Sequence, residues 1–289
     1  VDSDPKAIET LRLNRPSLDA RLDDVARLRG RDLPTEVEAL VGGPPCQSFS
    51  VFGNGAGTRD PRGVAVLEFL RVVDELRPRA FLMENVRGVT TAALDGREGA
   101  EAYARKGGLL AWLQEAYRAL GYRTDTFVVN AVNYGAPQIR ERAFILGNRV
   151  GAVAEFPPRS RSDRPEDGLP PFATLADAIG GDFDDPERME FSARKLAFLR
   201  RVPPGGNWRD MPVAVQRESM GKALGLKGGR AGFWRRLAWD HPSPAVTTTP
   251  NQAATSMCHP DETRALTVGE CAAVQGFPLD WRFSGSVPQ

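Results

Sequence analysis

The sequence has few residues that could form covalent cross-links or bind a metal. Its 289 residues include only three cysteines and two histidines. Cys46, Cys258 and Cys271 give neither an even number for a disulfide framework nor the close spacing of a metal site. Free thiols fit a reducing compartment, so we expect a cytoplasmic protein without a metal centre.

Long apolar runs and a net excess of charge are also missing. No apolar stretch approaches the roughly 18 residues of a membrane span, and the first residues do not resemble a signal peptide. We therefore expect no membrane partner. The 38 basic residues nearly balance the 37 acidic ones, so a nucleic acid would have to bind to a local basic cluster.

A short apolar run that ends in a rigid turn stands out among the features that are present. Residues 38–41 predict a buried strand, and the two glycines and two prolines of residues 42–45 end it. Cys46 follows at once. Ligands of open α/β sheets bind beyond the carboxyl ends of the strands, so Cys46 stands where a nucleophile would. A single loop cysteine is, by itself, more often without such a role.

The first half of the chain alternates strand and helix patterns. Apolar spacing predicts helices over 5–14, 64–76 and 108–120, and strands over 80–83, 126–130 and 143–147. Glu84-Asn85 follows the 80–83 strand directly, as Cys46 follows the one before it. This alternation predicts a parallel sheet with helices on both faces up to about residue 148. The glycine-rich stretch 52–63 is a candidate lid beside Cys46.

The second half is richer in proline, glycine and short elements. We expect helices over 175–179 and 192–199, a strand over 246–249, and a helix that begins at the Thr267 capping box and ends at Gly276. Between positions 194 and 236 there are eleven Lys and Arg residues against two acids, interleaved with three aromatic residues, Trp208, Phe233 and Trp234. Such a segment is typical of a nucleic-acid-binding surface.

Four motifs occur in a particular order along the chain. They are Pro44-Pro45-Cys46-Gln47, Glu84-Asn85-Val86, Gln138-Ile139-Arg140-Glu141-Arg142 and Gln275-Gly276-Phe277-Pro278. In this order they resemble the DNA cytosine-5 methyltransferases. The resemblance covers essentially the whole chain, although residues 156–262 match only in placement.

The resemblance implies an α/β fold of the Rossmann-like, S-adenosylmethionine-dependent methyltransferase type, with a smaller, irregular target-recognition domain. It implies a catalytic domain over 1–155, a target-recognition domain over 156–262, and a segment over 263–289 that packs back on the catalytic domain. The family also has an initial Phe-x-Gly-x-Gly loop and a final Gly-Asn-x-Val segment, which this sequence lacks. We therefore expect a family member without its first strand and its last segment.

The resemblance also implies a chemistry. Cys46 would add to carbon 6 of a flipped-out cytosine, which makes carbon 5 nucleophilic. Glu84 would share a proton with the ring, and Asn85 would orient the loop. Arg140 or Arg142 would favour the thiolate, and Arg142 would also hold the cytosine carbonyl oxygen.

Cofactor and DNA contacts follow from the same resemblance. S-adenosyl-L-methionine would be bound by Asp2 at its ribose, by Asp24 and Val25 at its adenine, and beside Pro45. DNA contacts are expected from Gln47, Ser48, Ser50 and Gln138. The partner is double-stranded DNA, with a cognate restriction endonuclease acting on the same site, and the protein is expected to be a monomer. Two alternatives stay open: a tRNA cytosine-5 methyltransferase, and a DNA-binding remnant without catalysis.

Overall fold

The computed structural model describes residues 1–34, 36–45, 61–94, 99, 101–181, 185–225 and 230–288. By their internal contacts, the residues form two compact units. Unit 1 comprises Val1–Asn130 and Glu141–Pro158, and unit 2 comprises Ala131–Arg140 and Arg159–Gln289. The target-recognition role expected for 156–262 and the return of 263–289 to the catalytic domain stay predictions. Residues 263–288 belong to unit 2.

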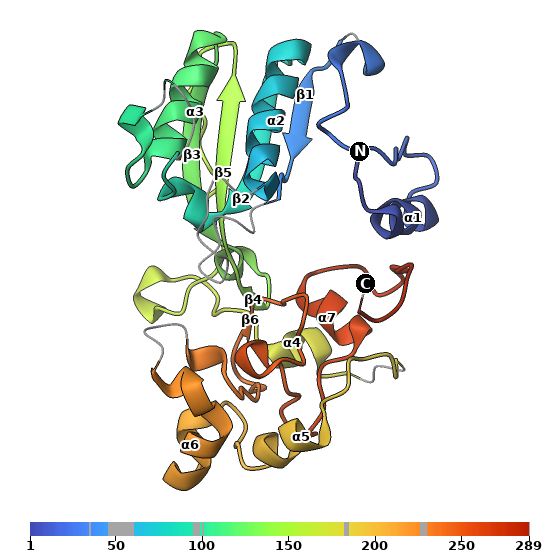
Figure 1. Ribbon diagram of the computed structural model, residues 1–289, viewed down its shortest axis with the longest axis vertical. Helices are drawn as coiled ribbons and strands as arrows, with labels where there is room; N and C mark the ends of the chain where they lie inside the picture. The colour runs from blue at the N-terminus through green and yellow to red at the C-terminus, as the bar shows by residue number, and fades with distance from the viewer. Residues whose placement is uncertain are drawn as a thin grey trace. The chain divides into compact units, whose positions relative to one another are not determined.

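Unit 1 is built on a four-stranded sheet (Figure 1). Its strands are β1 (Ala39–Gly42), β2 (Ala80–Val86), β3 (Arg123–Asn130) and β5 (Glu141–Asn148), in the spatial order β1-β2-β5-β3. β1 and β2 are parallel, whereas β5 runs antiparallel to both β2 and β3. The mixed α/β sheet agrees with the expected fold class, but the expectation of a wholly parallel sheet was wrong.

The direction of β5 follows from the length of its connection. Only residues 131–140 join β3 to β5, and their sole helical turn is a 3-10 turn over Ala131–Tyr134. A parallel return needs a crossover of a dozen or more residues, so this short connection brings β5 back antiparallel beside β3.

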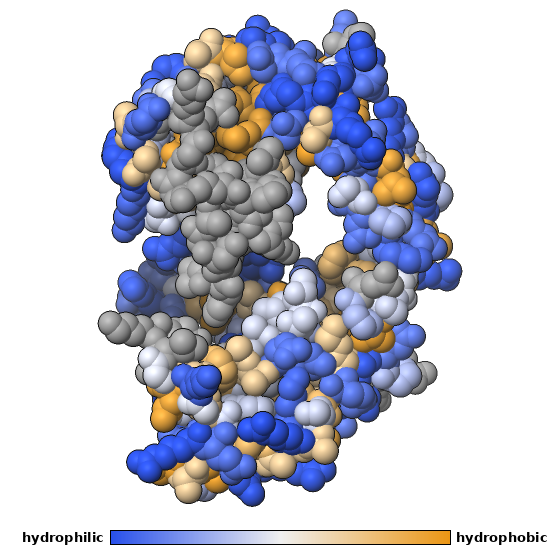
Figure 2. All heavy atoms as spheres, in the orientation of Figure 1, coloured by the Kyte–Doolittle hydropathy of each residue, from blue (hydrophilic) through white to orange (hydrophobic). Residues whose placement is uncertain are grey.

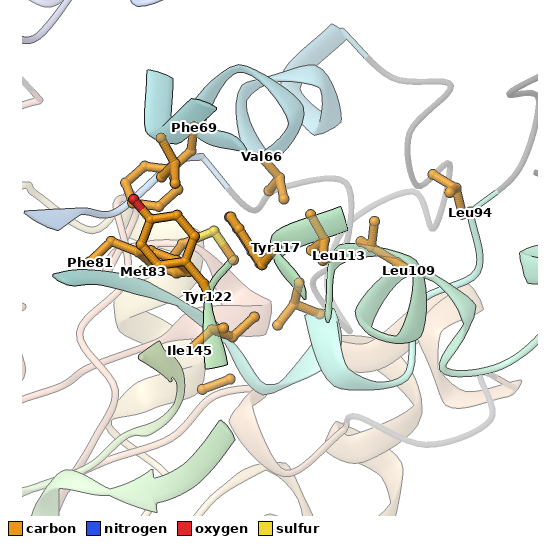
Figure 3. Packing of buried hydrophobic residues seen from close by; sticks show 13 residues of the cluster. Val66, Phe69, Phe81, Met83, Leu94, Leu109, Leu113, Tyr117, Tyr122 and Ile145 are labelled. Atoms are coloured by element: carbon orange, nitrogen blue, oxygen red, sulfur yellow. The ribbon is translucent and has the colours of Figure 1, made fainter. Parts of the chain in front are cut away.

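Two helices cover one face of this sheet. They are α2 (Pro61–Leu76) and α3 (Gly108–Ala119). Figure 3 shows their apolar side chains meeting those of β2 and β5 in one core. The members labelled there are Val66, Phe69, Phe81, Met83, Leu94, Leu109, Leu113, Tyr117, Tyr122 and Ile145.

The expectation that such helices would lie on both faces was wrong for α2 and α3. The crossovers β1-α2-β2 and β2-α3-β3 advance in the same direction across the sheet, and right-handed crossovers in one direction place their helices on one face. On the opposite face, Phe127 and Phe144 pack against Phe156, which follows β5.

The N-terminal segment begins with helix α1 (Pro5–Asn14). Asp4 caps this helix by accepting a hydrogen bond from the Lys6 N–H, and Pro5 occupies its first turn, as expected from the sequence. Asp2 forms a parallel bridge with Leu22, so the segments before and after α1 lie side by side.

Unit 2 consists of short elements. Its helices are α4 (Leu175–Ile179), α5 (Ala193–Leu199), α6 (Val213–Met220) and α7 (Val268–Val274), and its strands β4 (Gln138–Ile139) and β6 (Ser243–Pro244) pair in parallel. α7 begins at the Thr267 capping box, and Gly276 follows its end with φ of 80°, as the sequence predicted. The strand expected over 246–249 was wrong: the β structure stops at Pro244, which has no N–H to continue a ladder.

A buried arginine lies within unit 2. Arg236 is 5% exposed, and its guanidinium donates to the carbonyl oxygens of residues 199, 202, 259, 260 and 262 and to the Thr263 hydroxyl. The surrounding loops have no regular secondary structure, and the Arg236 guanidinium supplies hydrogen-bond donors to their carbonyl oxygens.

On the face drawn in Figure 2, hydrophilic residues dominate and hydrophobic residues occur in separated groups. Within the described part of the chain, no helix combines the length and apolarity needed to cross a bilayer. The same residues contain no group of His, Cys, Asp and Glu side chains that could hold a metal ion.

Candidate active site

The candidate site begins where the parallel strands β1 and β2 end. A turn over Gly43-Pro44-Pro45 follows β1, and Glu84-Asn85 lies at the end of β2. Because parallel strands end at the same edge of a sheet, these segments are neighbours. The Asn85 amide Nδ2 donates to the Pro44 carbonyl oxygen at 3.2 Å, and a Cβ placed on Gly43 would lie 3.4 Å from Glu84 Oε2. The turn is therefore tied to the carboxyl end of β2.

The Asn85 side chain is buried and held in a fixed orientation. Its side chain is 1% exposed, and its Oδ1 accepts a hydrogen bond from the Val86 N–H at 3.0 Å. Both sides of the amide are thus satisfied inside the protein, which fixes the orientation of the group that holds Pro44.

Gly42 permits the close packing below this turn. A Cβ at this position would lie 2.5 Å from Cε2 of Phe69 on α2. A Cβ at the last residue of β1 would therefore displace the Phe69 ring, and the glycine lets α2 pack this near the strand end.

Glu84 forms an ion pair with Arg142. Its Oε1 lies 2.7 Å from Arg142 Nε, and the two side chains are 38% and 20% exposed. In the antiparallel register Arg142 is opposite Val86, two positions from Glu84 and on the same face of the sheet. The direction of β5 therefore brings together two residues that are 58 positions apart in the sequence.

Several predicted residues lie outside the described part of the chain. These are Cys46 and the predicted DNA contacts Gln47, Ser48 and Ser50, together with residues 52–60 of the candidate lid. Their roles stay predictions. Pro45, predicted beside the cofactor, is the last described residue before them and is exposed.

The two predicted arginines fall in different units. Arg142 belongs to unit 1 with Glu84, whereas Arg140 ends the segment 131–140 that belongs to unit 2. The Arg140 carbonyl oxygen accepts a hydrogen bond from the Ala131 N–H, which closes the base of that segment. The predicted arginine that lies in the same unit as Glu84, Arg142, is the one that forms an ion pair with it.

Gln138 has a buried position, in contrast to the predicted DNA contact. Its side chain is 1% exposed, and its Nε2 donates to the Val274 carbonyl oxygen at the end of α7 at 3.3 Å. In this position the amide joins β4 to α7 and has no surface to present to DNA.

The aromatic residues of the 194–236 segment also differ from expectation. Trp208 and Trp234 are 7% and 5% exposed and belong to a core of unit 2. Exposed basic side chains do surround this core. Arg194 and Arg209 lie over the rings of Phe198 and Trp208. Trp208 and Trp234 are therefore packing residues. Arg194 and Arg209 are exposed and can meet an acidic ligand, whereas Arg236 of the same segment is buried.

The predicted cofactor acids lie on neighbouring segments. The Asp2 N–H donates to the Arg21 carbonyl oxygen, and the Asp23 N–H donates to the Asp2 carbonyl oxygen. This pairing places Asp2 and Asp24 near each other, and both are exposed. Val25 is half-buried beside them. Two carboxylates and an apolar side chain suit a ribose diol, an amino group and the face of an adenine, so the donor set fits S-adenosylmethionine.

Comparison with known proteins identifies the family of the chain. The family described as C-5 cytosine-specific DNA methylase matches residues 1–289. The chain belongs to the C-5 cytosine-specific DNA methylase family. The match confirms the family that the order of the four motifs indicated.

Individual members of the C-5 cytosine-specific DNA methylase family are similar over almost the whole chain. The type II methyltransferase M.PspPI of Psychrobacter sp. is 38% identical over 100% of this chain and 67% of its own length. The type II methyltransferase M.Eco47II of Escherichia coli is 36% identical over 98% of this chain and 65% of its own length. The chain thus spans about two thirds of these relatives.

A solved structure supports the fold. The methyltransferase EhMeth of Entamoeba histolytica has a TM-score of 0.62 to this chain at 10% identity, covering 97% of this chain and 78% of its own. At this identity the likeness concerns the fold alone.

Proposed function

We propose that this protein methylates carbon 5 of a cytosine in double-stranded DNA, as the modification enzyme of a restriction-modification system. The observation that carries the proposal is the junction of β1 and β2. The turn that leads into Cys46 is tied by Asn85 to the strand end that bears Glu84, and Glu84 pairs with Arg142. The names of the relatives, which are type II methyltransferases, support the same conclusion.

The reaction needs a nucleophile because carbon 5 of cytosine is unreactive in the aromatic ring. The Cys46 thiolate adds to carbon 6, and the displaced electron pair makes carbon 5 nucleophilic. S-adenosylmethionine, when bound, supplies the methyl group. The proton on carbon 5 then leaves to a base, and the returning electron pair expels the Cys46 thiolate.

Glu84 and Arg142 each stabilise part of the negative charge that this addition places on the cytosine. The Glu84 carboxyl group bonds to nitrogen 3 and the exocyclic amine of the cytosine, where the negative charge of the adduct would gather. Arg142, 2.7 Å from Glu84, orients that carboxyl group and donates to the cytosine carbonyl oxygen. The cytosine must leave the base stack to reach them.

Glu84→Gln tests this role. We expect turnover to fall by about 10²- to 10³-fold while the affinity for DNA stays unchanged, because the amide cannot transfer a proton to the ring. Glu38→Gln is the matched control, since Glu38 is an exposed glutamate directly before β1. The measurement is incorporation of labelled methyl groups into duplex DNA, and equal turnover of Glu84→Gln and wild type would remove Glu84 from the mechanism.

A covalent trap tests the reaction class. Duplex DNA made with 5-fluorocytosine has no proton to lose from carbon 5, so the adduct with Cys46 should persist and be found by mass spectrometry. Duplex DNA and tRNA should be compared as methyl acceptors in the same assay. Methylation of tRNA alone, or the absence of a Cys46 adduct, would overturn the proposal.

A further inference from the structure

Arg71 on α2 makes three hydrogen bonds from one partly buried guanidinium. Its Nη2 donates to the Val25 carbonyl oxygen at 2.8 Å, 46 positions away in the sequence. Its other nitrogens bind carboxylates of the same helix, Glu68 Oε2 at 2.7 Å and Glu75 Oε1 at 2.6 Å. The Arg71 side chain is 26% exposed. The two carboxylates hold the guanidinium in place, so that it presents one nitrogen to Val25.

Glu75 holds the other end of the same segment. Its second oxygen, Oε2, accepts a hydrogen bond from the Gly30 N–H at 2.6 Å. The Gly30 N–H and Arg71 together lower the pKa of Glu75 below its usual value, which keeps this carboxylate charged at neutral pH. Arg71 and Glu75 thus form a clamp that grips Val25 at its carbonyl and Gly30 at its amide.

The segment between these points has little other anchorage. Asp24 and its neighbours form a turn through hydrogen bonds within the segment itself, from the N–H groups of Ala26, Arg27 and Leu28. Leu28, 7% exposed, is its only buried hydrophobic residue. Bonds within a turn fix its shape but not its place on the sheet, and the clamp on α2 supplies that place.

We propose that Arg71, together with Glu75, is a positioning residue for the adenine end of the cofactor site. The inference rests on the proposed function and on the resemblance, which implies that Asp24 and Val25 bind the adenine of S-adenosylmethionine. The Val25 carbonyl that Arg71 holds belongs to the residue expected to pack on the adenine, and Asp24 precedes it. In this role Arg71 acts through the backbone of this segment, by its hydrogen bond to the Val25 carbonyl oxygen.

The side-chain type suits this role. Three acceptors in three directions match the planar fork of a guanidinium, whereas a lysine ammonium at the end of a flexible stem cannot meet all three at once. Arg71→Lys should therefore keep part of the clamp on the Val25 carbonyl, and Arg71→Met should lose all of it.

The test combines cofactor affinity with hydrogen exchange. For Arg71→Met we expect the dissociation constant for S-adenosylmethionine to rise about tenfold, the equivalent of ~1.4 kcal/mol or one hydrogen bond. The kcat at saturating cofactor should stay within about twofold of wild type, because the clamp does not touch the reacting atoms. Amides of residues 24–30 should exchange faster.

Arg77→Met is the matched control. Arg77 follows the same helix and also holds a backbone carbonyl, that of Leu120 at 3.1 Å, away from the segment 24–30. Its loss should leave cofactor affinity and the exchange of residues 24–30 unchanged. Equal weakening by Arg77→Met would reduce the Arg71 effect to a general loss of stability and would overturn the proposal.

The remaining outcomes separate this proposal from the proposed function. Unchanged exchange in Arg71→Met would refute the clamp, and faster exchange with unchanged cofactor affinity would refute its role in positioning. If the wild-type protein does not bind S-adenosylmethionine, the cofactor assignment itself fails, and the inference that rests on it fails too.

Discussion

Replacement of Glu270 by glutamine should destabilise unit 2 and remove part of its acid sensitivity. Glu270 is 3% exposed and lies on α7. Its two oxygens bind Arg264 in a fork, Oε2 to Nη1 at 2.7 Å and Oε1 to Nη2 at 2.9 Å. Oε2 also accepts the capping hydrogen bond from the Thr267 N–H at 2.8 Å. One carboxylate thus serves a buried ion pair and the start of a helix.

The expected loss in the free energy of unfolding depends on the contacts that remain when glutamine replaces Glu270. Removing one partner of a buried ion pair costs about 3–5 kcal/mol in the free energy of unfolding. Arg264 retains Glu262, whose Oε2 lies 3.1 Å from its Nε, and the glutamine retains one acceptor. We therefore expect a loss of about 3 kcal/mol at pH 7, at the lower end of that range.

The pH dependence has a definite sign. Burial opposes the charge of Glu270, but the Arg264 hydrogen bonds and the Thr267 N–H outweigh burial and hold the pKa of Glu270 below its usual 4.5. A carboxyl group with a depressed pKa in the folded state contributes stability above its unfolded pKa and loses it as pH falls. The wild-type protein should lose this contribution below about pH 4.5, and Glu270→Gln should not.

Urea unfolding followed by tryptophan fluorescence is the assay. Four of the five tryptophans, at positions 208, 234, 239 and 281, lie in unit 2, so the signal reports mainly on that unit. Glu218→Gln is the control, since Glu218 is an exposed glutamate on α6. A loss below about 1 kcal/mol at pH 7, or an acid dependence equal to that of wild type, would refute the reasoning.

Two further substitutions test the unit 1 site and core. Asn85→Ala removes the hydrogen bonds to Pro44 and Val86. It should cost about 1–2 kcal/mol in urea unfolding and lower turnover about tenfold, with cofactor affinity unchanged. Wild-type turnover in this variant would show that the position of the turn does not depend on Asn85. Gly147→Ala would place a Cβ 2.1 Å from Cε1 of the buried Phe81 and should cost about 1–3 kcal/mol in urea unfolding. Gly181→Ala, whose Cβ would meet no described atom within 4 Å, should leave stability unchanged, and equal stabilities of the two variants would contradict the packing.

Much of the local structure was predictable because its causes are local. Asp4 and Thr267 cap the helices that follow them, and Gly276 ends α7 in the left-handed region. The positions of Glu84 and Asn85 at a strand end also follow from a local pattern, an apolar run followed at once by polar residues. Within the site, this pattern was sufficient to select residues that the structure places beside the Gly43-Pro44 turn.

The errors arose where a residue's environment depends on distant parts of the chain. Trp208 and Trp234 lie among basic residues in the sequence, which suggested a nucleic-acid-binding surface. Apolar residues up to 57 positions away enclose them in a core instead. The resemblance implied that Gln138 contacts DNA, yet its side chain is buried and donates to the Val274 carbonyl oxygen of α7. Arg71 gave no functional signal at all, since its i,i+4 spacing to Glu75 is that of an ordinary solvated helix pair.

By itself, the sequence determined the family, the order of its motifs and the strand end that bears Glu84. Short-range causes suffice for these, because capping, turn residues and apolar runs act within a few positions. Only the tertiary structure decided that β5 returns antiparallel, and this direction puts Arg142 2.7 Å from Glu84. A hydrogen-bonded register between strands 58 positions apart is a property of the closed sheet, since neither strand contains the information about its partner.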